Sequence, residues 1–231
     1  KEGTTTFLAT TMTQSKENIL KAMRAVKEYR ETGSEKGARI AGIHLEGPFI
    51  AAAHKGAQPL EYVAAPNAEV FDEYNEASGN CIKIITLAPE VDGAIGFIRH
   101  LKEKGVVVSI GHTGAKCTEV LQAMDAGATN ITHTYNAQSP LHHREIGVVG
   151  SALLFDDLYC ELISDTIHVS VPAMQLLVKN KKADKLALIT DAMRAKGLAD
   201  GISELGGQTV IVKNGEARLQ DGTLAGSVLK M

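Results

Sequence analysis

The run RIAGIHLEGP, residues 39–48, is mostly apolar and ends on a carboxylate that Gly47-Pro48 follows. Such a run is typical of a strand buried on both faces of a parallel sheet. Six other short runs are rich in β-formers, and amphipathic helical runs separate them. The predicted strands are Thr5–Thr10, Arg39–Leu45, Ile82–Leu87, Val106–Ile110, Asn130–Thr134, Tyr159–Ile163 and Lys185–Thr190. This alternation predicts parallel strands joined by right-handed helical crossovers.

Both a doubly wound sheet and a (β/α)8 barrel fit this alternation. No G-x-G-x-x-G follows the first strand, which weakens the dinucleotide-binding version. Seven strands at this spacing favour an α/β barrel of the TIM type that lacks its first strand. Such barrels need about 250 residues, and the chain has 231. We also expect both ends to be cut, because the chain opens on Lys1 and stops at Met231, just after a Gly-Ser pair.

The tail follows a different pattern. Thr209–Lys213 and Glu216–Leu219 alternate around Asn214-Gly215, which is a strong signal for a two-residue hairpin. We therefore divide the chain into an incomplete barrel at residues 1–205, a β-hairpin toward an accessory β domain at 206–222, and a return to the barrel at 223–231.

Composition narrows the class of protein. Hydrophobic residues make up 44% and charged residues 22%, and the formal net charge is -3. This balance gives no reason to expect nucleic acid or an anionic membrane as a partner. The start is not a signal peptide, and no apolar run reaches the roughly 20 residues of a membrane span. We expect a cytoplasmic protein.

Four predicted strands end on a residue that binds metals or moves protons: Glu46, His112, His133 and Asp191. In a parallel barrel the carboxyl ends of the strands converge on one face, where active sites are built. A carboxylate and two imidazoles there suit a divalent metal such as zinc or iron. Asp191 is then placed to move protons during hydrolysis of an amide or a similar bond.

Each of these residues also has a structural interpretation. A single histidine at a strand end is more often a hydrogen-bonded structural residue than a ligand, but four such residues together favour function. His44 lies two residues before Glu46 and shares its face of the strand, so it is either another ligand or, more simply, a supporting or packing residue.

From about Thr4 to Ser227, the chain resembles the N-acetylglucosamine-6-phosphate deacetylases of the amidohydrolase superfamily. HLEGP and H-x-Y-N-A are the specific motifs. The segments that carry the resemblance are HLEGPF at His44–Phe49, IGHT at Ile110–Thr113, THTYNA at Thr132–Ala137, HHRE at His142–Glu145, DTIHV at Asp165–Val169, ITDAM at Ile189–Met193 and GTLAGS at Gly222–Ser227.

The resemblance implies a role for each matching position. The metal ligands are Glu46, His112 and His133, and the general acid and base is Asp191. His168 would hold the sugar and help to polarise the acetyl carbonyl. Arg144 would bind the phosphate and, in this family, can reach into the active site of a neighbouring subunit. The other implied substrate contacts are Ala57, Asn136, Ala137, Leu224, Ala225 and Gly226.

Simpler roles compete at several of these positions. Arg144 taken alone is more often a solvated loop charge, and His142 or His143 could serve a phosphate instead. Asn136 could be a turn residue. His168 could be a buried, hydrogen-bonded histidine.

 The resemblance implies a cytoplasmic homodimer, and no nucleic acid or membrane partner is expected. The protein would take a sugar phosphate as its substrate. Its activity would be hydrolysis of the acetamide of N-acetylglucosamine 6-phosphate to glucosamine 6-phosphate and acetate, with one or two divalent ions. The first barrel strand of the family and most of its β-sandwich have no counterpart in this sequence. The alternatives are an N-acetylgalactosamine-6-phosphate deacetylase, another amidohydrolase, and a non-catalytic metal- or ligand-binding barrel.

Overall fold

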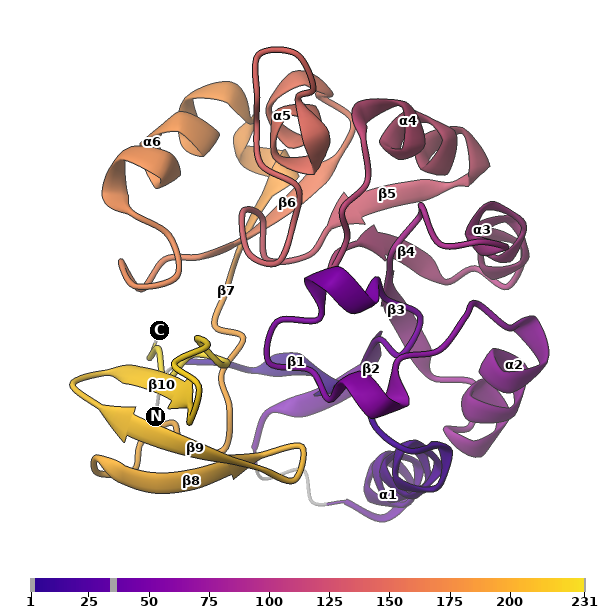
Figure 1. Cartoon of the computed structure of the whole chain (residues 1–231). Coiled ribbons are helices and arrows are strands. Elements are labelled where there is room, and N and C mark those ends of the chain that lie inside the picture. The colour runs from indigo at the N-terminus through magenta and orange to yellow at the C-terminus, as the bar shows by residue number, and fades with distance from the viewer. Residues whose placement is uncertain (1–2, 34–36, 231) are drawn as a thin grey trace.

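The computed structural model describes residues 3–33 and 37–230, and its main feature is a curled sheet of seven parallel strands (Figure 1). The strands follow one another in chain order, from β1 at one edge to β7 at the other. They are β1 (Thr6–Thr11), β2 (Arg39–Glu46), β3 (Ile82–Leu87), β4 (Val107–Ile110), β5 (Ala128–Ile131), β6 (Tyr159–Ile163) and β7 (Leu186–Ile189). The predicted α/β class with parallel strands is therefore confirmed.

Helices cover the outer side of this sheet (Figure 1). Ser15 begins the first helix by accepting a hydrogen bond from the backbone N–H of Asn18, and Asn67 begins the second in the same way through Val70. The helices are α1 (Lys16–Thr32), α2 (Ala68–Ala77), α3 (Ala94–Glu103), α4 (Cys117–Ala126), α5 (Gly147–Leu154) and α6 (Val171–Asn180). Short 3-10 turns lie at Ala52–His54, Leu60–Tyr62 and Ala183–Lys185.

One predicted boundary is wrong, and one helix was not predicted. Strand β5 ends at Ile131 and not at Thr134, because the chain turns there. The sequence also gave no sign of α5, which is apolar and buried around most of its circumference and so has no amphipathic period.

A second, antiparallel sheet lies beside the open side of the parallel one (Figure 1). The predicted hairpin is present as β9 (Gln208–Lys213) and β10 (Glu216–Leu219), and a strand that the sequence did not reveal, β8 (Gly201–Leu205), pairs with β9. This sheet has its own small core, which includes Val210, Leu219 and Ala225.

The large core fixes where the strands end. Its side chains come from both faces of the parallel sheet and from the helices, and Ile43, Leu45, Ile85 and Ile110 are fully buried. Backbone hydrogen bonds continue past the strand ends, from Gly47 to Thr86 and from Thr132 to Ile110. The polar residues that follow the strands are thus held at one edge of the sheet.

Candidate metal centre and its cavity

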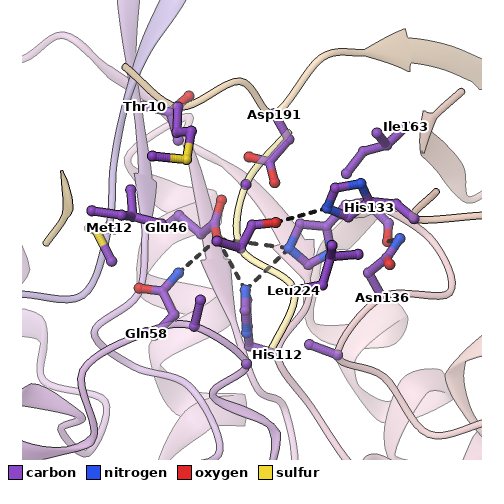
Figure 2. Close-up of a pocket in the computed structure, with 18 of the residues that line it drawn as sticks. Thr10, Met12, Glu46, Gln58, His112, His133, Asn136, Ile163, Asp191 and Leu224 are labelled. Atoms are coloured by element: carbon purple, nitrogen blue, oxygen red, sulfur yellow. Dashed lines mark hydrogen bonds and ion pairs between the residues drawn. The ribbon is translucent and has the colours of Figure 1, made fainter. Parts of the chain in front are cut away.

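Glu46, His112 and His133 meet at the carboxyl ends of their strands (Figure 2). Nε2 of His112 lies 3.0 Å from Oε1 of Glu46 and 3.1 Å from Nε2 of His133. Nε2 of His133 lies 3.7 Å from the same carboxylate oxygen. All three side chains are buried, and their potential ligand atoms lie within 4.8 Å of one another. The residues that the sequence singled out as ligands are therefore neighbours in space.

An unusual backbone conformation presents the side chains that follow β4, β5 and β7. The φ angles of His112, His133 and Asp191 are 51°, 30° and 46°, in the left-handed region that residues other than glycine seldom adopt. Such conformations cost about 1–3 kcal/mol each and persist where the surrounding structure enforces them, often at functional sites. Three of them at the ends of three strands mark this edge of the sheet as a candidate active site.

Hydrogen bonds fix the orientation of two members of the cluster. Nδ1 of His112 lies 2.9 Å from the carbonyl oxygen of His54 and donates its proton to it, which leaves Nε2 to face the cluster. The Gln58 amide donates to Oε1 of Glu46 at 2.8 Å. In the described part of the chain, Nδ1 of His133 has no hydrogen-bond partner.

The charges in the cluster fit a cation. Burial disfavours the charged form of His133, but the hydrogen bond and charge of Glu46 outweigh this effect and raise the pKa of His133 to about 9. Burial also acts against the Glu46 carboxylate, yet the two imidazoles hold its pKa well below the usual range. The carboxylate is thus balanced by a proton on a neighbouring ring. A divalent ion can replace that proton, and the one carboxylate and two imidazoles suit zinc, iron and similar ions.

Two further carboxyl groups lie near the cluster. The Asp191 carboxylate points toward it from across the cavity (Figure 2). Burial and the negative charge of Glu46 raise the pKa of Asp191. Burial likewise raises the pKa of Glu161, on β6, to about 7. A carboxyl group whose pKa moves toward neutrality is suited to both accepting and donating a proton.

His168 joins the end of β6 to the last part of the chain. Its Nδ1 lies 2.5 Å from Oδ2 of Asp165, and its Nε2 lies 2.8 Å from the carbonyl oxygen of Ala225. The Asp165 carboxylate also accepts hydrogen bonds from the backbone N–H groups of Ile167 and His168. The imidazole is therefore held in one orientation at the wall of the cavity.

These residues surround a cavity of about 670 Å³, a size typical of small-molecule sites. Of the predicted site residues, Arg144 is the exception, because it lies outside this cavity on an exposed turn. Its Nη1 lies 2.7 Å from Nε2 of His143. The predicted residues that line the cavity are Glu46, Ala57, His112, His133, Asn136, Ala137, His168, Asp191, Leu224, Ala225 and Gly226.

Some residues of the site carried no sequence signal. Gln58 and Met12 line the cavity from loops, and His54 contributes a backbone carbonyl that no motif could indicate. His44 does not join the cluster, since its Nε2 lies 2.7 Å from Oγ1 of Thr86. The position of His44, two residues before Glu46, marked it as a neighbour of the site, but no pattern in the sequence marked the loop residues Gln58 and Met12.

Fold and site together define a parallel α/β protein with a candidate divalent-metal centre at the carboxyl ends of its strands. No protein-family model matches the chain. Its sequence is 50% identical to N-acetylglucosamine-6-phosphate deacetylase of Bacillus subtilis, over 100% of this chain and 59% of that protein. It is 38% identical to N-acetylgalactosamine-6-phosphate deacetylase of Escherichia coli O157:H7, over 100% of this chain and 61% of that protein.

A solved structure extends this likeness to the fold. N-acetyl-D-glucosamine-6-phosphate deacetylase of Mycobacterium smegmatis, a mutant in complex with N-acetyl-D-glucosamine-6-phosphate, matches with a TM-score of 0.93 and 32% identity, over 99% of this chain and 59% of that one. The resemblance to N-acetylglucosamine-6-phosphate deacetylases is thus confirmed over the whole chain. The chain spans about six-tenths of the length of these relatives.

None of the helices in the described ranges, 3–33 and 37–230, is long and apolar enough to cross a membrane.

Proposed function

We propose that the protein hydrolyses the acetamide of N-acetylglucosamine 6-phosphate to glucosamine 6-phosphate and acetate. The observation that carries this proposal is the buried cluster of Glu46, His112 and His133 on the same cavity wall that Asp191 faces. The 50% identical relative, which is an N-acetylglucosamine-6-phosphate deacetylase, supports the choice of substrate.

Glu46, His112 and His133 would hold the divalent ion, which is zinc, iron or a similar metal, with one or two ions in the site. When bound, such an ion lowers the pKa of a coordinated water and polarises a carbonyl oxygen. The orientation of His112 by the His54 carbonyl supports this role, because it directs Nε2 toward the shared site.

Asp191 would move the protons. As a carboxylate it takes a proton from the attacking water, and as a carboxylic acid it gives that proton to the departing nitrogen of the sugar. Its raised pKa supports both steps, because the two protonation states are then closer in free energy near neutral pH. His168, held by Asp165, would hold the sugar and help to polarise the acetyl carbonyl, for which its Nε2 would exchange the Ala225 carbonyl for the substrate.

The phosphate would be bound by residues beyond the metal centre. Asn136 and Ala137 line the cavity, and together with Ala57 and the segment Leu224–Gly226 they would contact the substrate. Arg144 lies on an exposed turn outside the cavity, so we assign it to the cavity of a second copy of the chain in a homodimer. A guanidinium binds a phosphate bidentately, which suits this role.

The finer description of the fold belongs to the same proposal. Residues 1–205 would form a TIM-like barrel without its first strand, apart from strand β8, which pairs with β9 in the small sheet. Residues 206–222 would extend toward an accessory β domain, and residues 223–231 would return to the barrel. The backbone bonds from Ser227 to Asp191 and from Met193 to Ser227 support the return. A cytoplasmic location stays a prediction.

Acetate release by the full-length protein tests this function. We expect turnover of N-acetylglucosamine 6-phosphate that a chelator abolishes and added metal restores. Activity that survives complete metal removal would contradict the proposal, and so would metal binding without any turnover, which would favour a non-catalytic metal-binding barrel.

One alternative has a specific observation in its favour, namely the 38% identical N-acetylgalactosamine-6-phosphate deacetylase. The two substrates are epimers, so a comparison of kcat/KM on both separates the two functions. The higher identity to the N-acetylglucosamine-6-phosphate enzyme leads us to expect preference for that substrate.

A further inference from the structure

Gln58 is a buried polar residue that the proposed chemistry leaves without a role. It lies in the loop that follows β2, and its side chain is 5% exposed. Its Oε1 accepts a hydrogen bond of 2.6 Å from the backbone N–H of Thr13, and its Nε2 donates to Oε1 of Glu46 at 2.8 Å (Figure 2). One side chain thus connects the loops after β1 and β2 to the carboxylate of the cluster.

The contact to Thr13 decides which way the amide faces. A backbone N–H can only donate, so the atom that faces it must be the amide oxygen. The amide nitrogen is then directed at Glu46, whose carboxylate can only accept. Both ends of the Gln58 amide have a partner in this orientation. After a flip by 180°, the amide nitrogen would face the N–H of Thr13 and the amide oxygen would face the carboxylate of Glu46, and neither pair could form a hydrogen bond.

The other groups near this carboxylate oxygen are the imidazoles. Nε2 of His112 and of His133 lie 3.0 and 3.7 Å from Oε1 of Glu46. These are the same nitrogen atoms that would bind an ion, so they cannot also donate a proton to Glu46 when the ion is present. Among the described residues that contact Oε1, Gln58 is the one whose donor is left for that state.

We propose that Gln58 is a positioning residue for the metal centre, which holds the Glu46 carboxylate in the orientation needed for the ion. This inference rests on the proposed metal site. Gln58 would act through Glu46, and removal of a residue that orients a metal ligand typically lowers metal affinity about 10- to 100-fold. The expected effect is therefore on metal binding first, and on activity chiefly where metal is limiting.

The test compares Gln58→Met with the full-length wild-type protein. Methionine has a similar length but cannot accept from Thr13 or donate to Glu46. Zinc affinity is measured by competition with a chromophoric chelator, and we expect the dissociation constant to rise about 10- to 100-fold. Gln58→Asn, which is one methylene shorter and cannot reach both partners, should change it in the same direction and serves if the first variant does not fold.

Gln14→Met is the matched control. Gln14 also makes two contacts, to the backbone N–H of Ser15 and to the carbonyl oxygen of Gly206, but it does not touch a member of the cluster. We expect its zinc affinity to equal that of the wild type. Thermal unfolding adds a second measurement, because a purely structural role of Gln58 would lower Tm equally with and without zinc, whereas a positioning role reduces the rise in Tm that zinc causes.

The outcomes separate the two proposals. A wild-type protein that binds no zinc overturns the metal site itself. A wild-type protein that binds zinc, with a Gln58→Met variant of equal affinity and an equal zinc-induced rise in Tm, overturns the positioning role alone.

Discussion

The metal-binding end of the site and the turn that carries Arg144 differ in how the fold places them. Glu46, His112 and His133 are 4–7% exposed and stand at the ends of strands whose register is fixed by the core. Arg144 is exposed at the tip of a short turn, where His142 and Glu145 exchange backbone hydrogen bonds. The first group is complete within one chain, whereas Arg144 lies outside the cavity of its own chain.

One chain therefore provides the candidate metal ligands, but it does not place Arg144 at its own cavity. The proposed hydrolysis would need atoms held within about 0.5 Å of their productive positions, and buried strand ends provide that rigidity. In the proposed function, a guanidinium from Arg144 of a second copy would bind the phosphate. We therefore expect changes in the buried group to alter kcat or metal binding, and changes in the exposed turn to alter KM.

The largest effect is expected at Asp191. In Asp191→Asn, kcat should fall by about 10²- to 10⁴-fold, because the proton-transfer group is lost. The three metal ligands are unchanged, so metal content should be close to that of the wild type. Steady-state acetate release and elemental analysis of the same preparation measure both. Full activity in this variant would remove Asp191 from the mechanism.

A smaller, different effect is expected for Arg144→Ala. The loss of hydrogen bonds to a charged group costs about 1.5–3 kcal/mol, so KM for the phosphorylated substrate should rise about 10- to 150-fold while kcat changes little. N-acetylglucosamine without its phosphate is the control, and its slow turnover should be the same in both proteins. Equal losses on both substrates would show that the turn does not recognise the phosphate.

Asp165→Asn tests the support of His168 through stability. The backbone N–H groups of Ile167 and His168 and the imidazole outweigh burial and lower the pKa of Asp165. A lowered pKa in the folded state contributes stability above the unfolded value of about 4, and this contribution is lost as the pH falls through the folded pKa. The variant should be about 1 kcal/mol less stable than the wild type at pH 7.

Urea unfolding at pH 7 and at pH 3 measures this difference, which should shrink at the lower pH because the carboxyl of the unfolded wild-type chain is then protonated. A difference of the same size at both values of pH would mean that the charge of Asp165 contributes nothing.

The smallest effect is expected at the surface. Lys16 and Glu73 form an ion pair of 2.5 Å between α1 and α2, with about half of each side chain exposed. Exposed pairs contribute about 0–1 kcal/mol, so Lys16→Ala should change the free energy of unfolding by less than that and leave kcat and metal affinity unchanged. A large loss of activity would show that the contact between α1 and α2 affects the cavity residues.

The sequence predicted the elements whose signals are local. Buried apolar runs indicated the seven parallel strands, Asn214-Gly215 indicated the hairpin, and the residues after Ile110 and Ile131 indicated the cluster. It could not predict Gln58, because a glutamine in a loop has no periodicity and its two partners lie 12 and 45 residues away. The mostly apolar helix α5 was missed for a related reason, since a helix buried around most of its circumference has no polar face to reveal its period.

The most direct test of the central claim is anomalous diffraction from crystals of the metal-saturated full-length protein. We predict an ion at the carboxyl ends of β2, β4 and β5, about 2.0–2.2 Å from a carboxylate oxygen of Glu46 and from ring nitrogens of His112 and His133. Saturated crystals with no anomalous peak among these three side chains would contradict the account.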